Sequence, residues 1–414
     1  MMEYVFDFSL FLITISILIF PLLHIPLPHG IGDKSKVYIM EISLRFFNEY
    51  LGHVVGYFGH EARVTLARIL TGIATYAKPP RPRWLKITNR VINGVQCRIY
   101  EPLGKFKKNK NGMIFIPGGG FCFLSPEMYD SVFFSFIKRM GFVVIAVNYS
   151  KAPEAKFPTS INESEAVTKE FATNLYKEYD VDPTQICICG DSAGGTIATA
   201  VAQRLMRAKK TYIRTQVLIY PITSLMDFQS PSYQRYYNEY KHTALLHPLA
   251  MARGVLLYSG CPTTEENAYK ILRNQHISDK VRESLEYKET FNHENMPAEF
   301  LDKPIYYKPK EVKEDGELSA LFEQFALNPD FAPIMAKDLH GLPPTLICNT
   351  GYDIIRDDGF QYAAKLKKCG VPTEHKYYEK GIHGTFNMPF SKIQKQMLND
   401  ICDYLDKQFS TNNN

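Results

Sequence analysis

Residues 186–200 impose the tightest constraint on how this chain can fold. The apolar, β-prone run 186–189 leads into Gly-Asp-Ser-Ala-Gly at 190–194, and small residues that can form a helix follow. A Gly-x-Ser-x-Gly pattern between a strand and a helix is typical of a sharp, strained turn with the serine at its apex. Glycine on either side lets neighbouring backbone approach closely. The pattern predicts a nucleophile elbow, with Ser192 as the nucleophile and the Ala193 amide as a hydrogen-bond donor beside it.

Short apolar runs alternate with helix-length segments along most of the chain. The strands expected from these runs cover 95–100, 113–116, 142–147, 186–189, 217–219, 345–348 and 375–378. The expected helices cover 126–140, 160–178, 193–209 and 358–369. Continuous apolar strands that alternate with helices are typical of a parallel sheet covered on both faces. The predicted fold class is therefore α/β, with a mostly parallel central sheet and helices on both of its faces.

Two segments depart from this alternation. Residues 223–333 are rich in Tyr, Lys, Glu and Pro, and a structureless loop of that length is not expected in a compact domain, so we expect an inserted lid. Residues 37–76 have apolar positions at helical spacing with three glycine breaks, which predicts two helices. These helices either pack on the domain or form part of a cap. We divide the chain into a signal anchor (1–30), N-terminal helices and linker (31–83), a core (84–222 and 334–407) and a cap insertion (223–333).

The N-terminal run Tyr4–Leu23 is apolar over about the length of one bilayer crossing, interrupted by Asp7. It lacks the basic start and the small-residue cleavage site of a secretory signal peptide. An uncleaved signal anchor is therefore the favoured interpretation, with a cleaved signal or a buried helix as alternatives. Lys34, Lys36 and Arg45 follow the run and no Lys or Arg precedes it, so the positive-inside rule favours a cytosolic catalytic domain.

Composition argues against a metal centre and against a nucleic-acid-binding protein. The net charge of +5 over 414 residues is small for a nucleic-acid-binding surface. The eight cysteines are scattered, without the spacing of metal ligands or of a disulfide framework. Cys187 and Cys189 fall inside a strand run, where we expect them to be small buried hydrophobes. We expect neither a metal nor an organic cofactor.

Three surface features have competing interpretations. The lysine-rich loop 104–112 is expected to be a solvated hairpin turn, with contact to anionic lipid as the alternative. The glycosylation sequon at Asn162 opens an expected surface helix and could be used in a lumenal domain. A second sequon at Asn148 ends an apolar strand and is expected to be too buried. Accidental matches are the alternative for both sequons.

Gly118, Gly119 and Gly120 directly follow the expected strand 113–116. Glycines leave backbone N–H groups free to face a developing negative charge at close range, as acyl transfer by a serine requires. The three glycines, with Ala193, are therefore the candidate oxyanion-hole donors. A plain flexible turn is the alternative for this triplet.

A nucleophilic serine also needs a base and a group that orients the base. Asp353 lies nearest the end of the strand 345–348, where open α/β sheets place their sites. Asp357 and Asp358 fit the first turn of the following helix, where the helix dipole favours acidic residues. His383 comes just after the last expected strand and is the candidate base. We therefore predict Ser192, Asp353 and His383 as the catalytic residues, and their order along the chain is the α/β-hydrolase order.

The chain resembles the hormone-sensitive-lipase-like branch of the α/β-hydrolases, and in particular the arylacetamide deacetylase-like proteins. The matching segments are Pro117–Phe121, Asn148–Glu154 with Phe157-Pro158, Val181–Pro183, Gly190–Gly195, Leu218–Pro221, Tyr352–Gly359 and His383-Gly384. The resemblance implies an N-terminal anchor in the endoplasmic reticulum with the catalytic domain in the lumen, against the charge rule. We follow the resemblance because long domains translocate largely regardless of charge.

One departure from the family pattern concerns Pro117, where the family has histidine at the start of the glycine loop. Proline fixes φ and removes a backbone N–H, which could shift the loop and lower the rate. The resemblance also implies that a disulfide can join the cysteine after the glycine loop to one before the acid. Cys122 and Cys348 lie near those two places.

The sequence therefore predicts a membrane-anchored serine carboxylic-ester hydrolase of the esterase, lipase or deacetylase type, which cleaves small lipophilic esters through an acyl-enzyme. Its expected partners are the ester substrate and, through the anchor, membrane lipid. Pro117 motivates the alternative, a catalytically weak or inactive hydrolase fold that binds a lipophilic ligand. The physiological substrate and the oligomeric state stay open.

Overall fold

The computed structural model describes residues 24, 27–74, 79–241, 243, 246–309 and 312–410. The predicted membrane anchor Tyr4–Leu23 lies outside the described residues. Within the described ranges, no helix is both long and apolar enough to cross a bilayer.

A single eight-stranded sheet forms the centre of the described part of the chain, in the order β1-β2-β4-β3-β5-β6-β7-β8. Its strands are β1 (Leu85–Ile92), β2 (Val95–Pro102), β3 (Gly112–Ile116), β4 (Val143–Asn148), β5 (Ile186–Asp191), β6 (Thr215–Ile219), β7 (Thr345–Tyr352) and β8 (Thr373–Ile382). Pairing is parallel from β4 to β8 and antiparallel between β1, β2 and β4. This confirms the predicted α/β class with a mostly parallel sheet.

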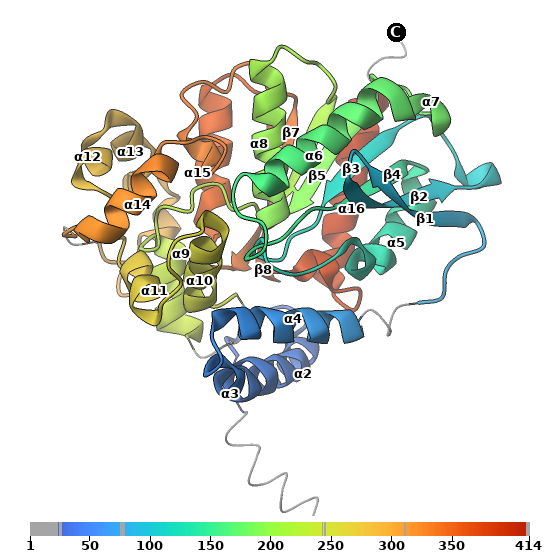
Figure 1. Cartoon of the computed structure of the whole chain (residues 1–414). Helices are drawn as coiled ribbons and strands as arrows, with labels where there is room; N and C mark the ends of the chain where they lie inside the picture. The colour runs from blue at the N-terminus through green and yellow to red at the C-terminus, as the bar shows by residue number, and fades with distance from the viewer. Residues whose placement is uncertain are drawn as a thin grey trace, which may run out of the picture.

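Helices cover both faces of the sheet (Figure 1). On one face, α5 (Asp130–Met140) and α16 (Lys392–Ser410) share an apolar cluster with alternate residues of the strands, Cys187 and Cys189 among them. On the other face, α6 (Thr159–Glu170), α8 (Ala193–Arg207) and α15 (Arg356–Lys368) pack on the intervening residues. Each central strand is buried on both sides, which explains its continuous apolar sequence.

The segment between β6 and β7 folds mainly into short helices. They are α9 (Pro231–Arg235), α10 (Pro248–Ser259), α11 (Glu265–Leu272), α12 (Asp279–Glu283), α13 (Leu285–Thr290) and α14 (Gly316–Ala326). The N-terminal residues form α2 (Lys34–Arg45), which continues through a π-helical turn into α3 (Gly52–Gly56), and α4 (His60–Ala74). The break before α4 falls at Gly59, with φ of 103°, whereas Gly52 and Gly56 lie within helical structure.

Ionic contacts hold α4 against the helices that precede β7. Glu265 of α11 pairs with Arg253 of α10, and it lies 3.7 Å from Arg63 and 3.8 Å from His60 of α4. Figure 1 places α4 below α10 and α11 at the same end of the molecule. Helix α4 therefore lies against α11, beside α10.

Two expectations about connections and cysteines are wrong. The lysine-rich loop 104–112 is not a hairpin, because it joins β2 to β3 and β4 lies between them in the sheet. Its Lys107 and Lys110 pair instead with Asp180. The disulfide implied by the resemblance is absent, because all eight cysteines are free and buried or half-buried. Cys122 and Cys348 belong to different apolar clusters.

Candidate active site

The turn between β5 and α8 holds Ser192 in a strained backbone conformation. Its φ is 53° and its ψ is −124°, a combination that persists only where the surroundings impose it. The glycines at 190 and 194 are required here, because a Cβ atom at either position would collide with a backbone carbonyl. The turn thus presents the Ser192 hydroxyl at the carboxyl ends of the parallel strands, where open α/β sheets place their sites.

His383 lies in hydrogen-bond contact with both Ser192 and Asp353. Its Nε2 is 2.9 Å from the Ser192 Oγ, and its Nδ1 is 2.8 Å from the Asp353 Oδ2. The Asp353 carboxylate also accepts from the Ile355 amide and the Thr350 hydroxyl. A proton on Nδ1, donated to Asp353, leaves Nε2 as the acceptor for the serine proton. The structure therefore brings together the three side chains that were predicted to be catalytic.

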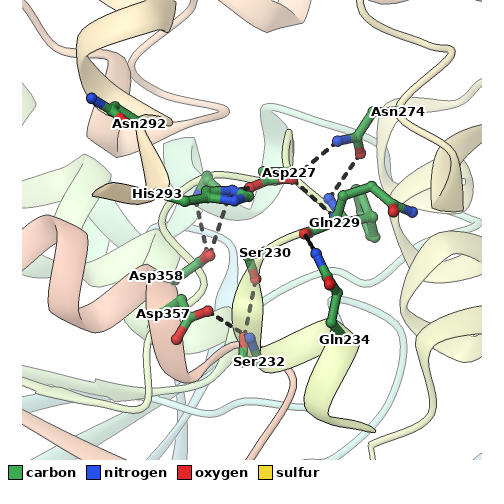
Figure 2. Close-up of polar contacts among 12 residues, drawn as sticks. Asp227, Gln229, Ser230, Ser232, Gln234, Asn274, Asn292, His293, Asp357 and Asp358 are labelled. Carbon is green, nitrogen blue, oxygen red and sulfur yellow. Dashed lines mark hydrogen bonds and ion pairs between the residues drawn. The ribbon is translucent and has the colours of Figure 1, made fainter. Parts of the chain in front are cut away.

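The two competing aspartates point elsewhere (Figure 2). Asp357 accepts from the Ser232 amide at 2.6 Å and pairs with Arg356. Asp358 accepts from the amides of Thr223 and Ser224 at 2.8 and 3.1 Å. Both carboxylates thus hold the start of the segment between β6 and β7 against α15.

Figure 2 also shows a buried pair that sequence reasoning missed. Asp227 accepts from Asn274 at 3.0 Å and lies 2.6 Å from the His293 Nε2. Burial opposes a charge on His293 and would lower its pKa. The hydrogen bond to Asp227 and the charge of that carboxylate outweigh burial, so the pKa of His293 is raised. The pair ties residue 293 to the start of the segment, 66 residues earlier. No local pattern could have revealed a contact across that separation.

The glycine loop after β3 is held by side chains from three other parts of the chain. The Gly118 amide donates to the Asp191 Oδ1 at 2.9 Å and lies 3.1 Å from the Tyr129 hydroxyl. The Tyr149 hydroxyl donates to the Pro117 carbonyl at 2.9 Å. Burial raises the pKa of Asp191 to about 6, although hydrogen bonds from Tyr129 and Gly118 favour its charged form. These contacts hold the loop at the end where the family histidine is replaced by proline.

This geometry corrects one expected donor. The Gly118 N–H already donates to a buried carboxylate, so it is engaged in holding the loop and is not free to receive an oxyanion. Gly119 and Gly120 adopt positive φ values of 102° and 55°, which glycine tolerates. Among the described residues, no hydrogen-bond acceptor is recorded for their two amides or for that of Ala193. The candidate donors are therefore Gly119, Gly120 and Ala193.

Tyr220 is a further neighbour of the site that the sequence did not single out. Its ring centroid lies 4.6 Å from that of His383, and its hydroxyl accepts from the Phe386 amide at 3.3 Å. The sequence signal for Tyr220 is the segment Leu218–Pro221 at the end of β6, which is one of the segments that match the family. Tyr220 restrains the ring of His383 from the side.

The candidate nucleophile is buried in this structure. Ser192 is 6% exposed. Helix α10 lies directly on the glycine loop, because a Cβ atom at Gly254 would be only 3.5 Å from the Gly120 carbonyl oxygen. No cluster of His, Cys, Asp and Glu within the described residues could hold a metal ion. The arrangement is suited to nucleophilic attack by Ser192 with proton transfer through His383.

The free energy of unfolding is expected to depend on the ionisation of Asp358. Burial raises the pKa of this carboxyl from 3.8 to about 7, and the nearby Asp357 adds to the shift, while hydrogen bonds from Thr223 and Ser224 oppose it. The pKa of Asp358 is higher in the folded than in the unfolded protein, so the protonated carboxyl stabilises the folded state. This stabilisation is complete below the unfolded pKa and is lost as the pH rises to about 7. The loss is on the order of 4 kcal/mol.

Asp358→Asn keeps the shape of the side chain, and the amide oxygen can still accept from the Thr223 and Ser224 amides. Because the amide does not ionise, the variant is expected to lose this pH dependence of the free energy of unfolding. Denaturant titrations at about pH 4.5 and about pH 8 measure the free energy of unfolding of both proteins. We expect the variant to gain stability relative to the wild type at the higher pH. An identical pH dependence in the two proteins would contradict the assignment.

Comparison with known proteins agrees with this fold. A family model described as the alpha/beta hydrolase fold matches residues 113–285 and 282–387. The arylacetamide deacetylase of Bos taurus is 32% identical over 409 residues, which cover 95% of this chain and 97% of that protein. The neutral cholesterol ester hydrolase 1 of Pongo abelii is 28% identical over 377 residues, which cover 87% of this chain and 88% of that protein.

Solved structures give the same result. An esterase of Pyrobaculum calidifontis aligns with a TM-score of 0.59 at 26% identity, covering 83% of this chain and 93% of that chain. The fold, the extent of the family match and the similarity to the deacetylase over nearly the whole length agree with one another. The chain belongs to the alpha/beta hydrolase fold family, among the relatives of arylacetamide deacetylase, and is an enzyme of the ester-hydrolase type.

Proposed function

We propose that this protein is a membrane-anchored serine carboxylic-ester hydrolase that acts on lipophilic esters. The observation that carries the proposal is the pair of hydrogen bonds made by His383, at 2.9 Å to Ser192 and 2.8 Å to Asp353. A nucleophile, a base and a group that orients the base, connected in that order, are what acyl transfer by a serine requires. A module that only bound a ligand would need none of these contacts.

In the proposed reaction, His383 takes the proton of Ser192 as the serine oxygen attacks the ester carbonyl. Asp353 keeps the Nδ1 proton in place and stabilises the imidazolium that forms. The amides of Gly119, Gly120 and Ala193 donate to the oxyanion. His383 then protonates the leaving alcohol, and an acyl-enzyme remains. Water attacks the acyl-enzyme with His383 again as the base, and the carboxylic acid is released.

We propose lipophilic substrates because α10 lies against the glycine loop and the Tyr220 ring lies beside His383. We assign the N-terminal helices (31–83) and the segment 223–333 to a common cap over the core. The contact of α10 with the glycine loop and the ion pairs of Glu265 with α4 and α10 support this division. The names of the related deacetylase and neutral cholesterol ester hydrolase suggest apolar esters or activated amides.

The proposed location is the membrane of the endoplasmic reticulum, with the catalytic domain in the lumen. The apolar run Tyr4–Leu23 supports a single anchor, since its length matches a bilayer crossing. The chain enters the described helices just after this run. Asn162, which is exposed at the start of α6, is the proposed glycan acceptor.

A fluorophosphonate probe applied to membranes that contain the full-length protein tests the proposal. We expect the label on Ser192, in a protein that stays in the pellet after an alkaline carbonate wash and whose glycan disappears in Asn162→Gln. Absence of labelling together with absence of p-nitrophenyl ester turnover would overturn the hydrolase. Labelling that appeared only in Pro117→His would favour the ligand-binding alternative. A labelled protein released by carbonate would overturn the anchor alone.

A further inference from the structure

Helix α4 contacts the end of the glycine loop through Arg68, and its Val64 packs nearby against the cluster of Cys122, Ala152 and Leu257. The Arg68 Nε donates to the Cys122 carbonyl at 2.7 Å, and its Nη2 donates to the Ala152 carbonyl at 2.8 Å. Cys122 directly follows the glycine loop and Phe121. Helix α4 lies before residue 113, where the match to the family model begins. A residue outside the matched core thus contacts the segment that carries the proposed oxyanion donors.

The orientation of the Arg68 guanidinium is fixed by Glu154. Two hydrogen bonds join the groups, from Nη1 to Oε1 at 2.7 Å and from Nη2 to Oε2 at 2.9 Å. This fork-to-fork geometry is available to arginine but not to lysine, whose ammonium group acts as a point charge. The hydrogen bond to Glu154 raises the pKa of Arg68 despite partial burial, so the side chain keeps its charge. Arg68 therefore holds two carbonyl oxygens at fixed positions.

The glycine loop needs such support because its backbone is unfavourable. Gly119, Gly120 and Phe121 have successive positive φ values of 102°, 55° and 63°. A positive φ at a bulky residue such as Phe121 persists only when the surrounding structure imposes it. Asp191 and Tyr149 hold the start of the loop, as described above. The amides of Cys122 and Phe123 both donate to the Gly119 carbonyl at 3.0 Å, and further contacts come from outside the loop.

Arg68 supplies support from outside the loop through two linked contacts. The Cys122 carbonyl accepts directly from Arg68. The Phe121 carbonyl accepts from the Ala152 amide at 3.0 Å, and the Ala152 carbonyl in turn accepts from Arg68. Loss of the guanidinium would therefore remove both hydrogen bonds and leave the carbonyls of the buried residues Cys122 and Ala152 without this donor.

We propose that Arg68 is a positioning residue for ester hydrolysis. Its side chain fixes the end of the glycine loop so that the Gly119 and Gly120 amides face the oxyanion. The N-terminal helices are then part of the catalytic unit as well as the link to the anchor. This inference rests on the proposed function. It concerns the transition state, because the two amides bind an oxyanion that the ground-state ester does not carry.

The test compares Arg68→Met with Arg63→Met in the full-length protein. Arg63 lies on the same helix, but it faces Glu265 and not the glycine loop, so its variant is the matched control. We expect kcat for a short p-nitrophenyl ester to fall roughly 10–100-fold in Arg68→Met, since a displacement of about 1 Å in a catalytic group can cost 10²-fold. KM should change less than about twofold, because ground-state contacts are retained.

Two further readouts separate positioning from a general loss of structure. Rates are divided by the number of active sites, titrated to the end point with the fluorophosphonate, so that unfolded molecules do not count. Inhibition by a trifluoromethyl ketone, whose adduct carries an oxyanion, should weaken by the same factor as kcat. Arg68→Lys, which keeps a point charge, should recover part of the rate. Glu154→Gln, which leaves both carbonyl contacts possible, should cost less than Arg68→Met.

Equal kcat per titrated site in Arg68→Met and Arg63→Met would overturn the proposal. So would a loss of kcat without any change in ketone inhibition. If Arg68→Met fails to fold, the same comparison is made with Arg68→Lys, for which an unchanged kcat and ketone affinity would count against the inference. A wild-type protein that neither labels nor hydrolyses esters would instead overturn the proposed function, so the two failures are distinguishable.

Discussion

Replacement of Ser192 by alanine is expected to lower kcat for a short p-nitrophenyl ester by about 10⁶-fold. The Ser192 Oγ lies 2.9 Å from the His383 Nε2, and alanine removes this oxygen. His383 and Asp353 then have no nucleophile to activate. Since the three residues act as a unit, the loss of one removes most of the effect of all three. Initial rates of the wild type and the variant, measured at equal concentrations of folded protein, test this expectation.

The control for this variant is Ser135→Ala. Ser135 lies on α5, where its hydroxyl donates only to a backbone carbonyl of its own helix. Both variants should unfold within a few degrees of the wild type, because a single small hydroxyl is removed in each. Turnover by Ser192→Ala above about 1% of the wild-type rate would mean that another group is the nucleophile.

Replacement of Asp353 by asparagine is expected to lower kcat about 10⁴-fold with little change in KM. The Asp353 Oδ2 is 2.8 Å from the His383 Nδ1, and the Oδ1 accepts from the Ile355 amide at 3.0 Å. The single side-chain oxygen of asparagine is needed to accept from the Ile355 amide. The side-chain nitrogen would therefore face His383 and donate to it. His383 would then carry its proton on Nε2 and could not accept from Ser192.

Asp358→Asn is the matched control for Asp353→Asn, since both change one buried carboxylate between β7 and the first turn of α15 to its amide. Asp358 contacts Thr223 and Ser224 and does not contact His383. The control should keep kcat within a few-fold of the wild type. Steady-state kinetics of the three proteins provides the measurement. A similar loss in both variants would indicate that buried charge in this region, rather than the orientation of His383, governs the rate.

Much of the fold could be predicted because the central strands are buried on both faces. Runs such as 113–116 and 186–189 are apolar at every position, so they stand out from the helices around them. Strand β1 was missed because it lies at the edge of the sheet and its polar run Thr88-Asn89-Arg90 interrupts the apolar pattern. The fine structure of the segment between β6 and β7 was also beyond local patterns, since its helices are short and depend on contacts such as that of Asp227 with His293.

The candidate site could be read from the sequence where each residue follows the end of a strand. Ser192, Asp353 and His383 all meet that condition, and their mutual contacts follow from the parallel order of β5, β7 and β8. The role of the Gly118 amide was misjudged because its acceptor, the side chain of Asp191, lies 73 residues further along the chain. Arg68 was missed for the same reason, as nothing near it in the sequence indicates a contact with Cys122.

The burial of Ser192 and the contact of α10 with the glycine loop link the stability of the helical cover to substrate entry. We expect a bulky ester to reach the serine only after these helices move, which would reduce its apparent affinity by the fraction of open molecules. Each additional contact between α4, α10 and the glycine loop stabilises the closed form and lowers that fraction. Bulky esters therefore report on the frequency of opening, whereas small ones report on the chemistry at the serine.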